Sequence, residues 1–166
     1  MPVTAPKISP FLWFDTEAEE AARFYTGIFK SSRITQIARY SDAGQEVHGK
    51  PAGTVLTVAF EIEGQPFTAL NGGPQFKFNE SVSFQISCDS QEEVDYYWEK
   101  LTEGGDKNAQ QCGWLKDKYG LSWQVVPSVI PGMLTDPDPE KVKRVMEVVM
   151  RSKKFDIAEL KRAYEG

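Results

Sequence analysis

The numbers of histidines and cysteines restrict the chemistry that this sequence could carry out. His48 is the single histidine among 166 residues, so a histidine-based triad or a multi-histidine metal site is excluded or confined to one ligand. It lies in the glycine-rich segment 44–53, where a solvated side chain is the expected state, and its role stays open. Cys88 and Cys112 show neither CxxC nor Cys/His spacing, which argues against a structural zinc site. We expect both to be reduced, with a single disulfide as the alternative.

Two segments of the second half combine polar and aromatic side chains at strand spacing. Residues 81–88 alternate between an apolar face and a face of small hydroxyls with one amide. This pattern fits either a strand open to water or the wall of a ligand cavity, because ligand sites combine apolar walls with a few hydrogen-bonding groups. Residues 113–127 form a predicted hairpin in which Ser122 and Gln124 share a face. These two residues fit either a polar spot in a pocket or a pair on a wet face.

No segment has the glycine pattern of a nucleotide-binding loop. The string NGGP at residues 71–74 follows a predicted strand, but it lacks GxGxxG spacing and precedes no predicted helix. This argues against a Rossmann-type site for a dinucleotide or for S-adenosylmethionine. The carboxylates of Asp15, Glu19 and Glu93 are explained by the starts of helices, where negative charge is favourable.

The elements that must position these residues occur in two similar series. In the first, a capping box of Thr16 and Glu19 begins a helix after an apolar strand, and three strands follow. In the second, Ser90 and Glu93 repeat the capping box, and a shift of 74 residues superposes Asp15 on Asp89. An internal duplication of a βαβββ unit is the simplest account, with chance similarity of two strand–helix units as the alternative. The predicted strands are 8–14, 34–40, 54–63, 66–71, 81–88, 111–116 and 121–126, and the predicted helices are 16–29 and the segment from Ser90 to Gly104.

Charge and hydropathy restrict the partners of the chain. Nineteen basic against twenty-four acidic residues give a net charge of −5 without a basic cluster, so nucleic-acid binding is not expected. The longest apolar stretch, 55–60, is far shorter than the roughly 20 residues that span a bilayer. Residues 1–7 contain no apolar signal core. We therefore expect a cytoplasmic protein with neither a nucleic acid nor a membrane as partner.

The last part of the chain differs from the two series. Residues 131–139 are predicted to be a turn-rich linker, and Asp138 begins a helix. A second short helix is predicted at 156–164. These helices cannot bury their apolar stripes alone, so they pack on the domain of the same chain or on a partner chain. The stripe of the first helix consists of Val142, Val145, Met146, Val149 and Met150.

Several strings in the sequence are distinctive. They are ISPFLWFDTEAEEAARFYTGIF at 8–29, ALNGGP at 69–74, FKFN at 76–79, CGWLKDKYGLSWQVVP at 112–127 and the tail around 155–166. These strings resemble the PhnB-like group of the vicinal oxygen chelate superfamily, a group often labelled 3-demethylubiquinone-9 3-methyltransferase. The superfamily includes glyoxalase I, bleomycin-resistance proteins and extradiol dioxygenases.

The resemblance implies an α+β fold of paired βαβββ modules that form a half-open, eight-stranded cleft, usually completed in a homodimer. It implies a single glyoxalase/bleomycin resistance-like domain at 1–130, with module one at 8–73 and module two at 81–127. A C-terminal helical extension follows at 131–166. Whether the modules pair within one chain or between chains stays open.

Catalytic members of the superfamily hold a divalent metal with four side chains, one from the first and one from the last strand of each module. At the matching positions of this sequence, the plausible donors are three neutral side-chain oxygens, and three such oxygens without imidazole or carboxylate make a weak site for a transition metal. We therefore expect no tightly bound metal and no other cofactor. The matching positions here are Ser9 or Pro10, then Asn71 as the only plausible donor of 68–71, then Ser83 and Gln124.

The resulting hypothesis is a homodimeric protein that binds an unidentified small organic molecule in an aromatic-lined cleft. Whether it is an enzyme stays open. One alternative is a lyase, isomerase or dioxygenase that recruits a metal weakly. Others are a methyltransferase, although no adenosyl cradle or activated nucleophile is visible, and a sequestration module, for which the acidity suits a cationic ligand. The expected site consists of Asn71, Ser83, Gln85 and Gln124 for hydrogen bonds, Trp13, Phe78 and Trp114 as walls, and Lys116 to attract an anion.

Overall fold

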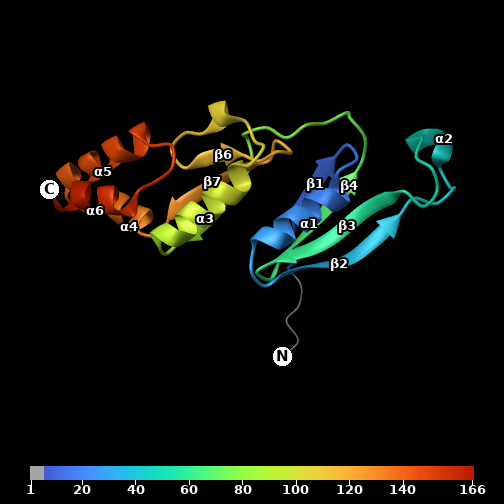
Figure 1. Cartoon of the computed structure of the whole chain (residues 1–166), viewed down its shortest axis with the longest axis horizontal. Coiled ribbons are helices and arrows are strands. Elements are labelled where there is room, and N and C mark those ends of the chain that lie inside the picture. The colour runs from blue at the N-terminus through green and yellow to red at the C-terminus, as the bar shows by residue number, and fades with distance from the viewer. Residues whose placement is uncertain (1–5) are drawn as a thin grey trace. The chain divides into compact units, whose positions relative to one another are not determined.

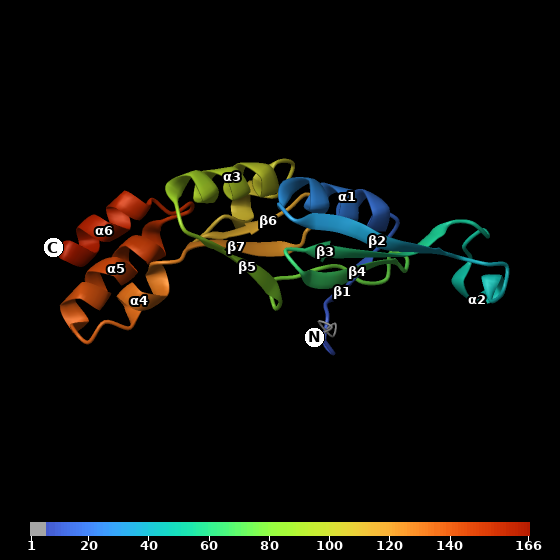
Figure 2. The same cartoon turned by 90° about the horizontal axis from the view of Figure 1, so that it is seen from below.

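The computed structural model describes residues 6–166, which divide into two compact units between Lys77 and Phe78. Each unit contains one open sheet with a helix lying along one of its faces (Figure 1, Figure 2). The predicted α+β fold class is therefore confirmed. The two units are described separately below.

The first unit is a four-stranded sheet with the order β1-β4-β3-β2. β1 runs parallel to β4, and the other neighbours are antiparallel. The sequence predicted these four strands in the correct order. The predicted polar loop after β2 contains one additional short helix, α2. The elements are β1 (Phe11–Phe14), α1 (Ala18–Ile28), β2 (Ser32–Arg39), α2 (Gln45–His48), β3 (Val55–Ile62) and β4 (Gln65–Asn71).

The core of the first unit lies between α1 and one face of the sheet. α1 buries its apolar residues as one stripe, because residues three or four positions apart share a face. The Tyr25 ring stacks on Phe60 at 6.2 Å, and Phe60 stacks on Phe67 at 5.3 Å. Within residues 6–77, no second helix lies on the opposite face. Core residues of this unit include Ala18, Ala21, Ala22, Tyr25, Ile28, Leu12, Phe14, Val58, Phe60 and Ala69.

The start of α1 differs from the prediction. The capping box of Thr16 and Glu19 does not form, and Glu17 occupies the N-cap position without a side-chain cap. The Ala18 N–H instead donates to Oδ1 of Asn71 at 2.8 Å, and Nδ2 of Asn71 donates to the Val55 carbonyl at 3.1 Å. Asn71 is 5% exposed, so its amide satisfies an unpaired N–H of the first turn inside the core. A side chain from β4 therefore replaces the local cap.

The second unit has a three-stranded sheet with the order β5-β7-β6, in which β5 is parallel to β7. This order matches β1-β4-β3 of the first unit. Ser90 caps α3 as predicted, since its Oγ accepts from the Glu93 N–H, whereas the Glu93 carboxylate accepts from the N–H of Asp89, one residue before the N-cap, rather than from that of Ser90. The elements are β5 (Ser83–Cys88), α3 (Gln91–Thr102), the 3-10 turn η1 (Lys107–Ala109), β6 (Trp114–Lys116), β7 (Ser122–Pro127), α4 (Ile130–Leu134), α5 (Pro139–Arg151) and α6 (Ile157–Glu165).

The second copy of the repeat lacks a strand in the position of β2. The turn η1 and an isolated bridge between Gln111 and Trp114 occupy the equivalent stretch. The predicted strand 111–116 is thus reduced to Trp114–Lys116. The physical reason is that the N–H groups of Cys112 and Gly113 donate to the carbonyls of residues 152 and 153, each at 2.8 Å. Residues 6–166 therefore contain four strands in one sheet and three in the other, rather than eight.

The C-terminal helices pack within the second unit. The predicted linker 131–139 is wrong over its first half, because α4 spans Ile130–Leu134 with Pro131 in its first turn. Asp138 and Asp156 cap α5 and α6 as expected of helix starts. The three helices share a cluster that reaches β7 through Val126. The buried members of this cluster are Val126, Ile130, Met133, Val145, Val148, Phe155 and Leu160.

We expect Asn71→Ala to lower the free energy of unfolding by about 2–3 kcal/mol, because the Ala18 N–H and the Val55 carbonyl lose their buried partner. Urea unfolding followed by circular dichroism measures this change. The matched control is Asn108→Ala, at an exposed position, where we expect a change below about 0.5 kcal/mol. A loss at Asn71 no larger than that of the control would contradict the assignment.

Candidate functional site

The predicted polar residues of the second unit lie on one face of its sheet, the open face, which is opposite α3. Cross-strand register fixes this arrangement, because directly paired residues share a face. The other face carries Phe84, Trp123 and Leu115 in one row, and Val94 and Leu101 of α3 are buried on that side. On the open face, one row contains Gln85, Gln124 and Trp114, and the next row contains Ser83, Ser122 and Lys116.

The hydroxyl and amide groups of the open face are close enough to interact. Nε2 of Gln124 donates to Oγ of Ser83 at 2.9 Å. Ser122 lies between Ser83 and Lys116 in the register and is 1% exposed, yet its Oγ has no hydrogen-bond partner. Buried hydroxyls are nearly always paired, so this one is an exception that calls for an explanation. Strand parity with Gln124 is the sequence signal that placed Ser122 on this face.

Lys116 is the cation of the open face. Its Nζ lies 2.5 Å from Oε1 of Glu80, a residue that the sequence analysis did not single out. The Lys116 side chain is 23% exposed, whereas that of Glu80 is 62% exposed. The hydrogen bond from Lys116 holds the pKa of the Glu80 carboxyl below its usual value. Glu80 is therefore an anion at neutral pH.

A buried carboxylate holds the hairpin that carries these residues. Asp117 is 2% exposed, and its Oδ1 accepts from the N–H groups of Tyr119 and Leu121. Its Oδ2 accepts from Nε1 of Trp123 at 2.9 Å. These bonds fix the turn between β6 and β7 and thereby the register of Lys116 against Ser122. The sequence analysis placed Asp117 within the predicted hairpin 113–127 but assigned it no role.

The two site residues predicted in the first unit lie on opposite faces of its sheet. Trp13 pairs with Leu70 on the face away from α1, whereas Asn71 pairs with Phe14 on the helix side. Both polar atoms of the Asn71 side-chain amide are used, Oδ1 as acceptor from Ala18 and Nδ2 as donor to Val55. The sequence did not indicate this, because a side chain at the end of a strand can turn to either face.

Trp13 explains the glycines of the NGGP string. Its Nε1 donates to the Gly73 carbonyl at 2.9 Å, and a Cβ on Gly72 would lie 2.3 Å from the indole ring. Phe76 packs edge-on against the ring at 4.9 Å. The glycines thus allow the backbone to approach a tryptophan. Phe78, the remaining predicted wall residue, is half-buried in the segment before β5.

His48 is engaged in local packing. It ends α2, its Nδ1 accepts from the Lys50 N–H at 2.9 Å, and its ring lies 4.5 Å from that of Tyr40. The Tyr40 hydroxyl in turn donates to the Asn71 carbonyl at 2.7 Å. These contacts give His48 a part in ordering the segment after β2.

The two cysteines are free thiols, as expected. Cys88 is fully buried, and burial raises the pKa of its thiol to about 12, with Glu93 and Asp89 adding to the effect. A thiol that stays protonated at neutral pH is a poor nucleophile. Cys88 is therefore a core residue.

The donors at the positions implied for a metal do not suit a divalent transition metal. Residues 6–166 contain no group of three or more His, Cys, Asp or Glu side chains placed to hold a metal ion. The amides of Asn71 and Gln124 and the hydroxyl of Ser83 are uncharged and already bonded to protein groups. Such neutral donors favour none of the catalytic metals strongly.

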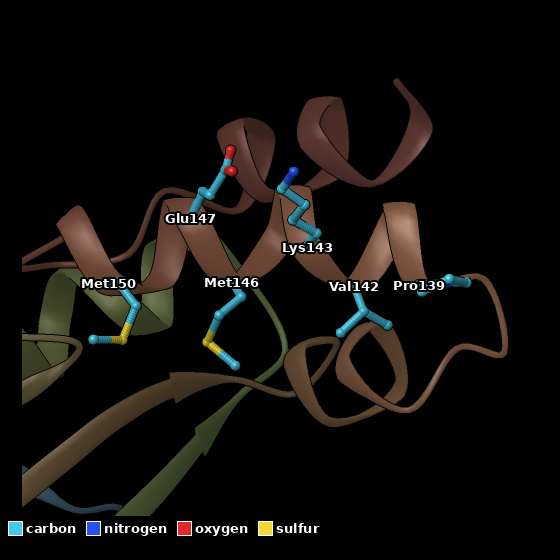
Figure 3. A pocket seen from close by; sticks show the side chains of 6 residues that line it. All are labelled: Pro139, Val142, Lys143, Met146, Glu147 and Met150. Carbon is cyan, nitrogen blue, oxygen red and sulfur yellow. The ribbon is translucent and has the colours of Figure 1, made fainter.

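A hollow of about 420 Å³ lies elsewhere, along α5 (Figure 3). The side chains of Val142, Met146 and Met150 point to one side of the helix, and Lys143 and Glu147 point to the other (Figure 3). The predicted stripe is thus divided, with Val145 buried in the cluster of the C-terminal helices and Met146 and Met150 40% and 60% exposed. Lys143 and Glu147 are the charged residues of its lining, and the other lining residues are Pro139, Val142, Met146 and Met150. Among residues 6–166, no helix is both long and apolar enough to cross a membrane.

Comparison with known proteins gives a family match and structural neighbours. Residues 6–126 match the family model described as 3-demethylubiquinone-9 3-methyltransferase, a match that ends before α4. The PhnB protein from Bacillus cereus is 35% identical, with a TM-score of 0.62, and the match covers 74% of this chain and 99% of that chain. Protein PA1353 from Pseudomonas aeruginosa is 18% identical, with a TM-score of 0.56 and coverage of 74% and 98%, a likeness of fold alone. No curated protein is similar enough in sequence to match.

We expect one thiol of the native protein, that of Cys112, to react with Ellman's reagent at pH 8, because Cys112 is half-buried and Cys88 is fully buried. Two thiols should react in guanidinium chloride. A Cys112→Ser variant should lose the native reaction and keep one thiol after denaturation. Rapid native labelling of Cys88 in that variant would contradict its burial.

Proposed function

The chain belongs to the 3-demethylubiquinone-9 3-methyltransferase family, and from this premise we propose that it binds a small organic molecule on the open face of the β5-β7-β6 sheet, without a tightly bound metal. The resemblance to the PhnB-like group is confirmed by the same match. The observation that carries the proposal is the cluster of amide, hydroxyl and ammonium groups on a sheet face opposite the helix. Ser122 supports it further, since its buried hydroxyl has no partner within the protein.

The open face combines the two properties that ligand sites need. Gln85, Gln124 and Ser83 supply hydrogen-bonding groups, and Trp114 beside Gln124 supplies a half-buried aromatic surface. Specificity in small-molecule sites comes from a few polar groups fixed within apolar surroundings. The hairpin that carries Trp114 and Lys116 is fixed by Asp117, so these groups are pre-organised.

The proposal gives the predicted residues different roles. In it, Gln85, Gln124 and Ser83 form hydrogen bonds with the ligand, Lys116 attracts an anion, and Trp114 and Phe78 provide apolar contact. Asn71 and Trp13 act as positioning residues of the first unit, because their polar atoms are bonded to Ala18, Val55 and Gly73.

Metal independence is part of the proposal. A lyase, isomerase or dioxygenase of the superfamily's type needs a metal that polarises vicinal oxygens of its substrate. The donors of Asn71, Ser83 and Gln124 are uncharged amides and a hydroxyl, without imidazole or carboxylate, and this argues against such a site. Binding without metal-assisted turnover is therefore the function that we favour.

Methyl transfer is the alternative function that the description of the family names. It needs a cradle for the adenosyl cofactor, and the NGGP string at the end of β4 is the glycine-rich candidate. Its glycines instead accommodate the indole of Trp13 and accept its N–H. This use of the string favours ligand binding over methyl transfer.

We also propose a cytoplasmic homodimer. Two free thiols, Cys88 and Cys112, suit a reducing compartment. The dimer follows from the family resemblance, and the exposed apolar side chains of Phe11 and Val82, at 61% and 62%, are compatible with burial against a second copy.

A fragment screen by NMR tests the binding proposal. We expect hits to shift the side-chain amides of Gln85 and Gln124 and the indole of Trp114 together, because these groups share one row of the sheet. Gln124→Leu should weaken such a hit about tenfold by removing the amide. Gln65→Leu, at the exposed start of β4, is the matched control and should leave affinity unchanged. Hits that cluster elsewhere would contradict the proposal.

Calorimetric titration of chelator-treated protein tests both alternatives. We expect neither Zn²⁺ nor Mn²⁺ to bind with a dissociation constant below about 100 μM, because the donors are uncharged amides and hydroxyls. S-adenosylmethionine should likewise produce no saturable heat. Uptake of one metal ion per chain at micromolar affinity would overturn metal independence, and saturable cofactor binding would restore methyl transfer.

A further inference from the structure

Lys116 and Ser122 form a pair of hydrogen-bond donors on the open face. They lie directly opposite one another on antiparallel strands. Directly opposed residues have Cβ atoms about 4.5–5.5 Å apart, so an ammonium and a hydroxyl at these positions can form hydrogen bonds with the same small group of a ligand. The Ser122 hydroxyl is buried and unpartnered, and it does not contribute to the fold through any hydrogen bond.

The two members of the ion pair between Lys116 and Glu80 differ in their exposure to solvent. In the ion pairs at Arg23, Arg33, Arg151 and Lys154, the cation side chain is between 42% and 73% exposed, whereas Lys116 is 23% exposed. Glu80 is the exposed member of its pair, at 62%. Glu80 can therefore move into water at little cost in free energy. Lys116 stays half-buried, where an unpaired ammonium is unfavourable, so an anion that replaces Glu80 is stabilised there.

The segment before β5 presents Glu80 to Lys116. Oδ1 of Asn79 accepts from the N–H of Ser81 at 2.9 Å and from its hydroxyl at 2.5 Å. An asparagine that bonds the backbone two residues ahead forms a compact turn. Glu80 occupies the middle of this turn, and its carboxylate reaches Lys116 on the open face.

We propose that Lys116 and Ser122 bind the carboxylate of an aromatic carboxylic acid, and that Glu80 occupies Lys116 as an internal competitor until the ligand displaces it. This inference rests on the proposed function, since it names the ligand class of the same face. One ammonium and one hydroxyl donor match the two oxygens of a single carboxylate, the group that already binds Lys116 in the protein.

The aromatic body of the ligand follows from Trp114. It lies on the same strand and the same face as Lys116, two residues away, which corresponds to about 7 Å along β6. A ring attached directly to the carboxylate reaches from the ammonium to the indole. Gln124, opposite Trp114, borders the same space.

The test measures the affinity of benzoate and of its neutral analogue benzamide by NMR titration. We expect Glu80→Gln to tighten benzoate binding about tenfold, because the competing carboxylate is removed and a charge-assisted bond becomes available. Benzamide affinity should not change. Lys116→Met, which keeps the apolar stem, should abolish the preference for benzoate.

Two further variants separate the subsite from general effects. Glu159→Gln removes the same charge from another ion pair at 2.5 Å, that with Arg151, and should leave benzoate affinity unchanged. Ser122→Ala in the Glu80→Gln background should weaken benzoate about fivefold without lowering the thermal midpoint, because the hydroxyl has no partner in the fold. A structural role for Ser122 would instead lower the midpoint.

The outcomes distinguish this inference from the proposed function. If benzoate and benzamide bind Glu80→Gln equally and both shift Gln85 and Gln124, the carboxylate subsite is wrong and the binding face stands. If benzoate does not shift these signals at millimolar concentrations, the subsite is wrong as well. An additional failure of every fragment on the open face would remove the proposed function.

Discussion

The alternation of side chains along a β-strand is the constraint on which the whole arrangement depends. In each unit one helix, α1 or α3, covers one face of the sheet, so that face forms the core and the other face is available for different uses. In the second unit the face on the side of α3 carries Leu115, Trp123 and Val125, all at most 3% exposed. A shift of one residue in any strand would exchange these with the polar row. The carboxylate of Asp117 prevents this shift in the β6–β7 hairpin by holding both its turn and Trp123.

Two side-chain amides on the equivalent strands β4 and β7 show how the same group serves different purposes. Asn71, at the end of β4, turns to the helix side, where it replaces the cap of α1. Gln124, in β7, faces away from α3 and bonds to a hydroxyl of the neighbouring strand. α3 needs no such help, because Ser90 and Glu93 cap it locally. The difference between the units therefore begins with the residue at the first helix position, where the expected box of Thr16 and Glu19 does not close.

Sequence patterns predicted most of the strands because apolar alternation and turn residues are local signals. Parity placed Ser83 and Gln85 on one face of their strand and Gln124 with Ser122 on one face of theirs, and the register brings both sets to the same face of the sheet. The patterns did not predict α4, since Pro131 and Gly132 favour turns and only burial of Ile130 and Met133 against α5 stabilises a helix there. They also missed Glu80 and the burial of Ser122, because both depend on which distant residue lies opposite. The orientation of Asn71 was likewise beyond local signals, since its partners are 16 and 53 residues away.

The docking of the C-terminal segment onto the sheet of the second unit affects the order of biosynthesis. Gly113 has a φ of +80°, and a Cβ there would lie 2.4 Å from the ring of Phe155. Gln91 at the start of α3 bonds to the backbone of Phe155 and Ile157. The second unit therefore cannot reach its final packing on the ribosome before the residues around 155 have emerged, whereas the first unit has all its strands by Asn71. Nascent chains of this protein should thus expose an incomplete second half during translation, a period in which chaperones can recognise it.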